Sequence, residues 1–221
     1  MLERAGRLRA EGLSVALLNM ASVTMAGGGV FGGAGAQEEN FHRRSDAKRF
    51  TMDQPTNYPI DWTACLVSPS VTVFRGTEKE GYPFLDEPFK VTMLSCPAIM
   101  KPELTEDREY QHAWQKRDME DKIAAIVHAA VESGCHTAVL SAFGCGAFGN
   151  PPGVVARIFR EQLETAPIRQ VIFCIFDDHN THKWHNRCGN ILPFKNEFAC
   201  LCGEAASSSD AIERSRKFQR L

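Results

Sequence analysis

The sequence predicts an α/β domain in which a largely parallel sheet is covered by helices on both faces. Segments with strand patterns alternate along the chain with segments of helical composition. The central strand candidates, such as "LSVALLN" and "VIFCIF", are apolar throughout, as is typical of strands buried on both faces of a sheet. The chain has 221 residues and no internal repeat. We therefore expect one domain of ordinary size over residues 1–200 and a tail over residues 201–221.

The strand candidates combine apolar or alternating residues with a clear stop. Gly76 follows one of them and Pro97 follows another. Between the first strand candidates, residues 51–70 are punctuated by Pro and Ser and are predicted to be irregular, with Tyr58 and Trp62 as packing residues. The predicted strands are residues 13–19, 71–76, 89–96, 136–143 and 169–178.

Three segments are predicted to be helical. Residues 36–50 have helix composition and place two acids in the first turn, where the helix dipole favours them. Residues 107–133 carry apolar side chains at three- and four-residue spacing and stop at Gly134. Residues 153–164 begin beside two prolines, which are common in a first turn. After Cys202 the chain is polar and Ser-rich, so the tail is predicted to be disordered.

Composition and charge exclude several classes of protein. The net charge of −2 gives no basic field, so no direct nucleic-acid partner is expected. No apolar run approaches the ~18 residues of a membrane helix, so no membrane partner is expected. The apolar stretch Val15 to Leu18 is too short for a secretory signal, which predicts an intracellular protein, cytoplasmic or nuclear. Most of the eight cysteines lie in strand-like runs and are predicted to be buried free thiols, with disulfides as the alternative.

Two glycine-rich loops each follow a predicted strand. The first, "AGGGVFGGAGAQEEN" (26–40), leads into the adjacent acids Glu38 and Glu39, and the second, "GCGAFGNPP" (144–152), precedes a helix. Ligands of such sheets bind beyond the carboxyl ends of the strands, and helix N-termini favour anions. Two loops of this kind suit a diphosphate ligand, with Phe148 as a flat face for a sugar or base. Neither is a Walker A loop, and "GCGAFGN" lies too late in the chain for a dinucleotide fingerprint.

The first loop resembles the motif of the poly(ADP-ribose) glycohydrolases, in which three glycines precede Gln-Glu-Glu. Here seven residues separate Gly29 from Gln37. "LLNMAS", "VTVFRG", "SAFGCGAFGNPP" and "DDHNTHKWHNRCGNILPF" resemble the microbial type in the same order, so that the resemblance covers residues 13–199. It implies the macrodomain fold, a three-layer α/β/α arrangement with a mixed sheet. The chain differs in carrying Met25-Ala26 where that type usually has Asn-Pro, and in having only about a dozen residues before the first strand.

The resemblance also implies roles for individual residues. Glu39 would protonate the departing ribose oxygen and then deprotonate the attacking water, while Glu38 would hold ribose hydroxyls and Asn19 would place the distal ribose. Burial and mutual repulsion would raise the pKa of one of the two acids. The other residues expected to contact substrate are Gly27, Gly28, Gly29, Gln37, Gly144, Cys145, Gly146, Ala147 and Phe148. The alternative to these catalytic roles is that Glu38 and Glu39 are two solvated acids at a helix N-terminus, as is usual for a Glu-Glu pair.

A second constellation suggests a metal. His179, His182, His185 and Cys188 are three residues apart, and imidazole and thiolate are zinc ligands. Residues at successive three-residue steps turn gradually around a helix, however, so that only neighbouring ligands would share a face. The segment also resembles the strand-to-helix connection of the same family. We therefore expect a polar loop near the adenine end of the cleft, with no metal and no cofactor.

The sequence as a whole predicts an enzyme that hydrolyses the ribose–ribose O-glycosidic bonds of poly(ADP-ribose). Its partners would be poly(ADP-ribose) or ADP-ribosylated proteins, and ADP-ribose would be the product. Two alternatives stay open: a macrodomain that binds ADP-ribose with weak or no catalysis, and a hydrolase of another ADP-ribose derivative.

Overall fold

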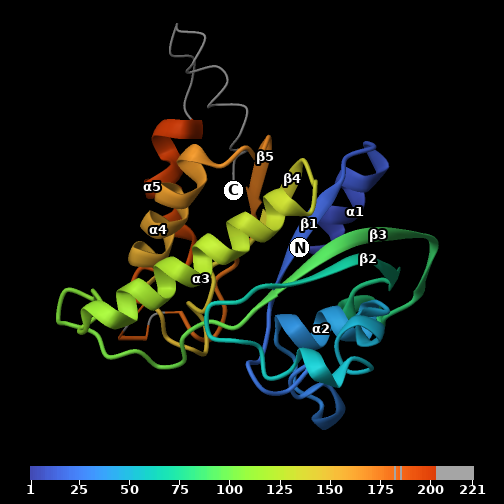
Figure 1. Cartoon of the computed structure of the whole chain (residues 1–221), viewed down its shortest axis with the longest axis horizontal. Coiled ribbons are helices and arrows are strands. Elements are labelled where there is room, and N and C mark those ends of the chain that lie inside the picture. Colours follow the sequence, from blue (N-terminus) through green and yellow to red (C-terminus); the bar gives the residue numbers. More distant parts are fainter. Residues whose placement is uncertain (182, 185, 203–221) are drawn as a thin grey trace, which may run out of the picture.

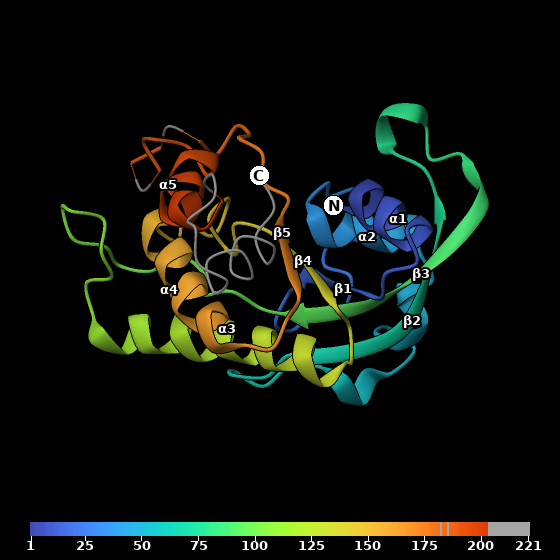
Figure 2. The same ribbon diagram turned by 90° about the horizontal axis from the view of Figure 1, so that it is seen from above.

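The structure, a computed structural model, describes residues 1–181, 183–184 and 186–202. Helices cover both faces of one five-stranded sheet, which confirms the predicted three-layer α/β/α class (Figures 1 and 2). The strands are β1 (Val15–Met20), β2 (Leu66–Arg75), β3 (Phe84–Cys96), β4 (Thr137–Leu140) and β5 (Gln170–Phe173). The helices are α1 (Leu2–Ala10), α2 (Gln37–Arg44), α3 (Ala113–Glu132), α4 (Pro152–Thr165) and α5 (Ile191–Cys202).

The sheet is mixed and largely parallel, as predicted. Its strand order is β2-β3-β1-β4-β5, so β1 lies in the middle. β1 is parallel to both of its neighbours, β3 and β4, and β4 is parallel to β5. Only β2, at one edge, runs antiparallel to its partner. The carboxyl end of β1 is therefore flanked by the carboxyl ends of β3 and β4.

The two faces of the sheet carry two separate cores. Ala16 and Leu18 of β1 pack with α3, α4 and α5, whereas Val15 and Leu17 pack with α1 and α2 on the opposite face. Alternate residues of a strand point to opposite faces, and here both faces are apolar because both are covered. Burying each large aliphatic side chain contributes about 1.5–3 kcal/mol. The central strand that leads into the first glycine loop is thus fixed on both sides.

Two helices of the structure were not predicted. In α1, Leu2, Ala5 and Leu8 are buried at three-residue spacing, but arginines between them disguise the pattern in the sequence. In α5, Phe194 and Phe198 lie one turn apart and pack against Phe173 of β5, with ring centroids 5.1 and 4.9 Å away. Each helix is stabilised by this tertiary packing, which a short and mixed sequence pattern does not reveal.

Several predicted boundaries were wrong. β3 begins earlier than expected because its first half extends past the other strands as an antiparallel pair with the end of β2, where polar residues are tolerated (Figure 1). β2 begins earlier than expected at its opposite end, where Leu66 pairs with Ser95 of β3. β4 and β5 end earlier than expected, at Leu140 and Phe173, and a backbone hydrogen bond from Cys174 N to Leu140 O closes their pairing. α3 begins at Ala113, since residues 107–112 form turns and an isolated bridge.

The remaining expectations concern the C-terminal tail, the cysteines and membrane-spanning helices. α5 continues to Cys202, so residues 201–202, which the sequence assigned to the tail, are helical. The rest of the tail lies outside the described residues. The six cysteines whose side chains are described are free thiols, as expected, but only Cys96 and Cys145 are buried, and Cys188 is exposed. No helix among the described residues combines the length and the apolar character that crossing a bilayer requires.

Candidate functional site

The two glycine-rich loops lie side by side at one edge of the sheet. Loop 1 (residues 21–36) follows β1, and loop 2 (residues 141–151) follows β4. Because β1 and β4 are parallel neighbours, both loops leave the same carboxyl edge. This is the edge at which parallel sheets bind ligands. The predicted convergence of the two loops is confirmed.

Gln37 joins the start of α2 to the end of β1. Its Nε2 donates to Leu18 O at 2.8 Å, and its Oε1 accepts from Met20 N at 2.8 Å. The amide therefore bonds the backbone of β1 as a neighbouring strand would. The sequence assigned Gln37 to substrate binding, but both polar groups of its side chain are used to hold the helix that carries the two acids.

Glu38 fastens the near part of loop 1. Its Oε2 accepts from Ser22 N at 2.7 Å and its Oε1 accepts from Gly27 N at 3.1 Å. Burial, with a smaller contribution from the nearby charge of Glu39, raises the pKa of this carboxyl to about 7, against the opposing effect of the two backbone hydrogen bonds. Asn19, one of the groups that lower this pKa, is buried at the end of β1 and donates to Ser95 Oγ at 3.1 Å.

This raised pKa predicts how the stability of the fold depends on pH. A carboxyl that holds its proton more tightly when folded contributes stability below its ordinary pKa of 4.5, and this contribution is lost as the pH rises to about 7. Other acids can obscure the trend, so the comparison is between wild type and Glu38→Gln. We expect the melting temperature of wild type, relative to the variant, to fall between pH 5 and pH 8. A constant difference across that range would contradict the raised pKa.

Glu39 holds the next part of loop 1 with only one of its oxygens. Oε1 accepts from Gly29 N at 2.8 Å. Glu39 is only 7% exposed, and its Oε2 is buried without a hydrogen-bond partner among the described residues. A buried carboxylate oxygen without a partner is costly and uncommon. Asn19 Oδ1, at the end of β1, is likewise buried without a partner among the described residues, so the site has two oxygens to which a ligand could donate.

The first three glycines of loop 1 are required by this close approach. Gly27 and Gly28 have φ of 74° and 54°, which glycine adopts at low cost. A Cβ on Gly28 would lie within 3.0 Å of Glu39 Oε1 and 3.1 Å from Glu38 Oε2. A Cβ on Gly29 would lie 2.9 Å from Ala34 Cβ. A side chain at Gly28 would displace the acids and one at Gly29 would displace the loop, whereas one at Gly27 would press on Met52 and His42.

His42 and Thr51 support α2 and loop 1 through buried contacts, and the sequence analysis missed both residues. His42 Nδ1 lies 2.9 Å from Glu38 O, and His42 Nε2 lies 3.1 Å from Thr51 Oγ1. Burial lowers the pKa of His42. The side chains of His42 and Met52 also fill the space directly beneath Gly27. The only sequence signal was the position of His42 one helical turn after Glu38.

Loop 2 is shaped by Asn150, which the sequence analysis missed. Its Nδ2 donates to Ile99 O at 2.7 Å and Gly144 O at 3.0 Å, and its Oδ1 accepts from Tyr110 Oη at 2.8 Å. Gly144 has a φ of 72°, and a Cβ there would lie 2.5 Å from Asn150 Nδ2. The fixed turn exposes Ala147 and leaves Phe148 half-buried against the core.

The residues of loop 2 do not contribute equally to its surface. Cys145 is fully buried, its N–H donates to Ala142 O, and burial raises the pKa of its thiol. Its expected contact with substrate is therefore not visible in this arrangement. Among the described residues, the backbone N–H groups of Gly146, Ala147 and Phe148 have no acceptor. Three successive free N–H groups can bind an anion.

The histidine segment forms a connection from β5 to α5. The carboxylate of Asp177 accepts from Asn190 N at 2.6 Å and Ile191 N at 3.3 Å, and so caps the N-terminus of α5. Within the part of the chain that is described, no three potential metal ligands come together. His182 and His185 lie outside the described residues, so the zinc alternative is untested.

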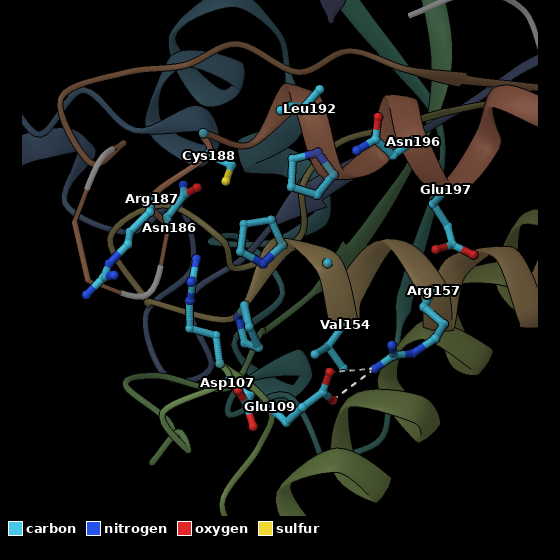
Figure 3. A pocket seen from close by; sticks show the side chains of 16 residues that line it. Asp107, Glu109, Val154, Arg157, Asn186, Arg187, Cys188, Leu192, Asn196 and Glu197 are labelled. Atoms are coloured by element: carbon cyan, nitrogen blue, oxygen red, sulfur yellow. Dashed lines mark hydrogen bonds and ion pairs between the residues drawn. The ribbon is translucent and has the colours of Figure 1, made fainter.

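A separate hollow of about 370 Å³ lies beyond loop 2, between the starts of α4 and α5 and residues 107–109 (Figure 3). Arg157 and Glu109 form an ion pair at its rim, in which Arg157 Nη2 donates to Glu109 Oε1 at 3.0 Å and to Oε2 at 2.9 Å. Neither Glu38 nor Glu39 lines it. The hollow is therefore distinct from the site of the two acids.

Comparison with known proteins agrees with this geometry. The family described as microbial-type PARG (poly(ADP-ribose) glycohydrolase), catalytic domain, matches residues 1–76, which include loop 1 and α2. A solved structure of a variant of the PARG from Thermomonospora curvata is 30% identical, with a TM-score of 0.71, over 89% of this chain and 76% of that chain. The PARG from Deinococcus radiodurans, solved in complex with ADP-ribose, is 30% identical, with a TM-score of 0.73, over 91% and 82% of the two chains. A search of curated proteins finds no match.

Proposed function

The chain belongs to the microbial-type poly(ADP-ribose) glycohydrolase family, and we propose that it releases ADP-ribose from poly(ADP-ribose) with Glu39 as the catalytic acid. One observation supports this role above all. Glu39 Oε1 is fixed by Gly29 N–H, while Oε2 is buried without a partner among the described residues. An acid that must meet a substrate oxygen needs one oxygen held and one oxygen free.

The reaction follows from this division. The proton of Glu39 passes to the departing ribose oxygen as the glycosidic bond breaks, which leaves an oxocarbenium-like centre on the bound ribose. The resulting carboxylate then takes a proton from the water that attacks this centre. Ordinary glycosidases divide these tasks between two carboxylates on opposite sides of the bond. Here Glu38 and Glu39 are successive residues of α2, so one acid serves both steps.

Glu38 has a different part in this mechanism. Its two oxygens already accept from Ser22 N and Gly27 N, so it shapes the loop that receives the ribose. An ionised carboxylate has about four acceptor positions. Two remain for the ribose hydroxyls, which is the role that the sequence analysis expected of it.

Loop 2 supplies the binding site for the diphosphate. The free N–H groups of Gly146, Ala147 and Phe148 can donate to phosphate oxygens. Loop 1 and loop 2 follow neighbouring strands, so the ribose and the diphosphate of one ADP-ribose unit can occupy both at once. No cation is needed to neutralise the diphosphate in this arrangement.

The test is incubation of the protein with poly(ADP-ribosyl)ated protein, with and without EDTA, followed by measurement of free ADP-ribose. We expect rapid release in both conditions. Binding of ADP-ribose without release would favour a macrodomain that only binds. Release only from a protein carrying a single ADP-ribose unit would favour another ADP-ribose derivative as substrate. Loss of release in EDTA would contradict the metal-free mechanism.

Phe148→Ala is expected to give a graded loss of ADP-ribose affinity. The ring is half-buried at the end of loop 2, where it can stack on a ribose. Such stacking contributes about 0.5–1.5 kcal/mol beyond the buried area. Calorimetry with ADP-ribose measures the loss, and a melting curve separates it from destabilisation, because the ring also packs on the core. Unchanged affinity would remove Phe148 from the site.

A further inference from the structure

The glycines at the tip of loop 1 are not explained by packing. A Cβ built on Gly32, Gly33 or Gly35 would meet no atom within 4 Å. Of these three, only Gly33 has a positive φ, of 82°. Residues 31–36 are all exposed. Gly27, Gly28 and Gly29 each lie against a neighbouring side chain, with Gly28 against the two acids, whereas Gly32 and Gly35 have open space beside them.

Phe31 directly precedes Gly32 in this exposed part of loop 1. Its side chain is 87% exposed, more than that of any other large hydrophobic residue of the described chain. The backbone around it is nevertheless fixed. Arg43 Nη2 donates to Val30 O at 3.2 Å and also to Ala34 O, while Gly32 N and Ala34 N both donate to Gly29 O. An ordered turn thus presents an aromatic ring to solvent with small neighbours on either side.

The position of Phe31 relates it to the leaving side of the reaction. Gly29 N–H holds Glu39, and two residues of chain span at most about 7 Å. The oxygen that Glu39 protonates belongs to the neighbouring ADP-ribose unit, on the ribose that carries adenine. The departing adenine therefore begins one ribose away from Glu39. Aromatic side chains stack on bases irrespective of sequence.

We propose that Phe31 is a stacking platform for the adenine of the ADP-ribose unit on the leaving side of the bond. It binds the second unit of a chain, and so favours the polymer over a single ADP-ribose unit. The 87% exposure of Phe31 leaves its ring accessible to a base. The inference rests on the proposed function, because only a polymer places a second adenine at this position.

Binding measurements in the inactive Glu39→Gln background test this role. Phe31→Ala should weaken binding of poly(ADP-ribose) by about fivefold to a hundredfold, the usual range for loss of one base–aromatic stack. Phe31→Leu should behave like alanine, because it is apolar but not flat, and Phe31→Tyr should restore binding. Affinity for ADP-ribose alone should not change. Phe84→Ala, which removes another exposed phenylalanine at the start of β3, is the matched control.

Turnover by the otherwise wild-type enzyme gives a second measurement. Phe31→Ala should raise KM for the polymer and leave kcat nearly unchanged, because the ring binds the leaving unit without touching the reacting atoms. Equal polymer affinity of Phe31→Ala and its parent would overturn the proposal, as would an equal loss of affinity for ADP-ribose. If the parent Glu39→Gln protein binds ADP-ribose but not the polymer, the proposed function itself fails, and the role of Phe31 fails with it.

Discussion

Glu39→Gln is expected to bind ADP-ribose as wild type does and to lose turnover by about 10²–10⁴. The amide keeps an oxygen that can accept from Gly29 N–H, so the loop should keep its shape. It cannot donate and then retrieve a proton. Because one group serves both steps of the reaction, the loss should lie towards the upper end of that range.

The free oxygen of Glu39 makes this substitution unusually clean. Oε2 has no partner among the described residues, so replacing it with an amide nitrogen breaks no hydrogen bond there. The melting temperature should not fall. Single-turnover release of ADP-ribose from the polymer measures the rate, and calorimetry with ADP-ribose measures affinity. Turnover close to wild type would remove Glu39 from the role of catalytic acid.

Glu38→Gln provides the contrast. Both of its oxygens accept backbone N–H groups, so an amide nitrogen would face a donor at Ser22 or Gly27. The loop itself should be disturbed, and ADP-ribose affinity should fall together with turnover. The two adjacent substitutions are thus expected to separate chemistry from loop geometry.

The sequence predicted the place of the site better than the contacts within it. Loop 1, loop 2 and the two acids were identified because glycine runs after apolar strands are local patterns, and the parallel order of β1 and β4 then brings them together. The alternation of elements likewise predicted the largely parallel sheet, and the family resemblance implied that it is mixed. Local patterns cannot, however, identify which backbone group a side chain will reach.

Gln37 and Asn150 illustrate this limit. Gln37 was predicted to bind substrate, yet its side chain bonds the backbone of Leu18 and Met20 in β1, which lie 19 and 17 residues earlier in the chain. Asn150 was overlooked, because its partners Ile99 and Tyr110 lie on a distant segment. The helices α1 and α5 were missed for the same reason, because their apolar faces are stabilised by packing against the sheet and not by a strong local pattern.

Gly28→Ala is expected to abolish most of the activity, although neither acid is itself replaced. A Cβ at this position would lie within 3.0 Å of Glu39 Oε1 and 3.1 Å from Glu38 Oε2, so both carboxylates would have to move. A displacement of about 1 Å at a reacting group can cost about a hundredfold in rate. The φ of 54° adds a conformational cost of roughly 1–2 kcal/mol for alanine.

Gly81→Ala separates these two effects. Gly81 has a φ of 80° between β2 and β3, but a Cβ there would meet nothing within 4 Å. Both variants should therefore lose a similar amount of stability from backbone strain, and only Gly28→Ala should lose turnover of poly(ADP-ribose). If the turnover of Gly28→Ala were as high as that of Gly81→Ala, the acids would tolerate displacement. The first glycines of loop 1 could then not be explained by the need to bring Gly29 N–H against Glu39. If instead its turnover falls by about a hundredfold at matched stability, the glycines serve catalysis by their lack of a side chain, because that is what lets the backbone hold one oxygen of the acid and leave the other free.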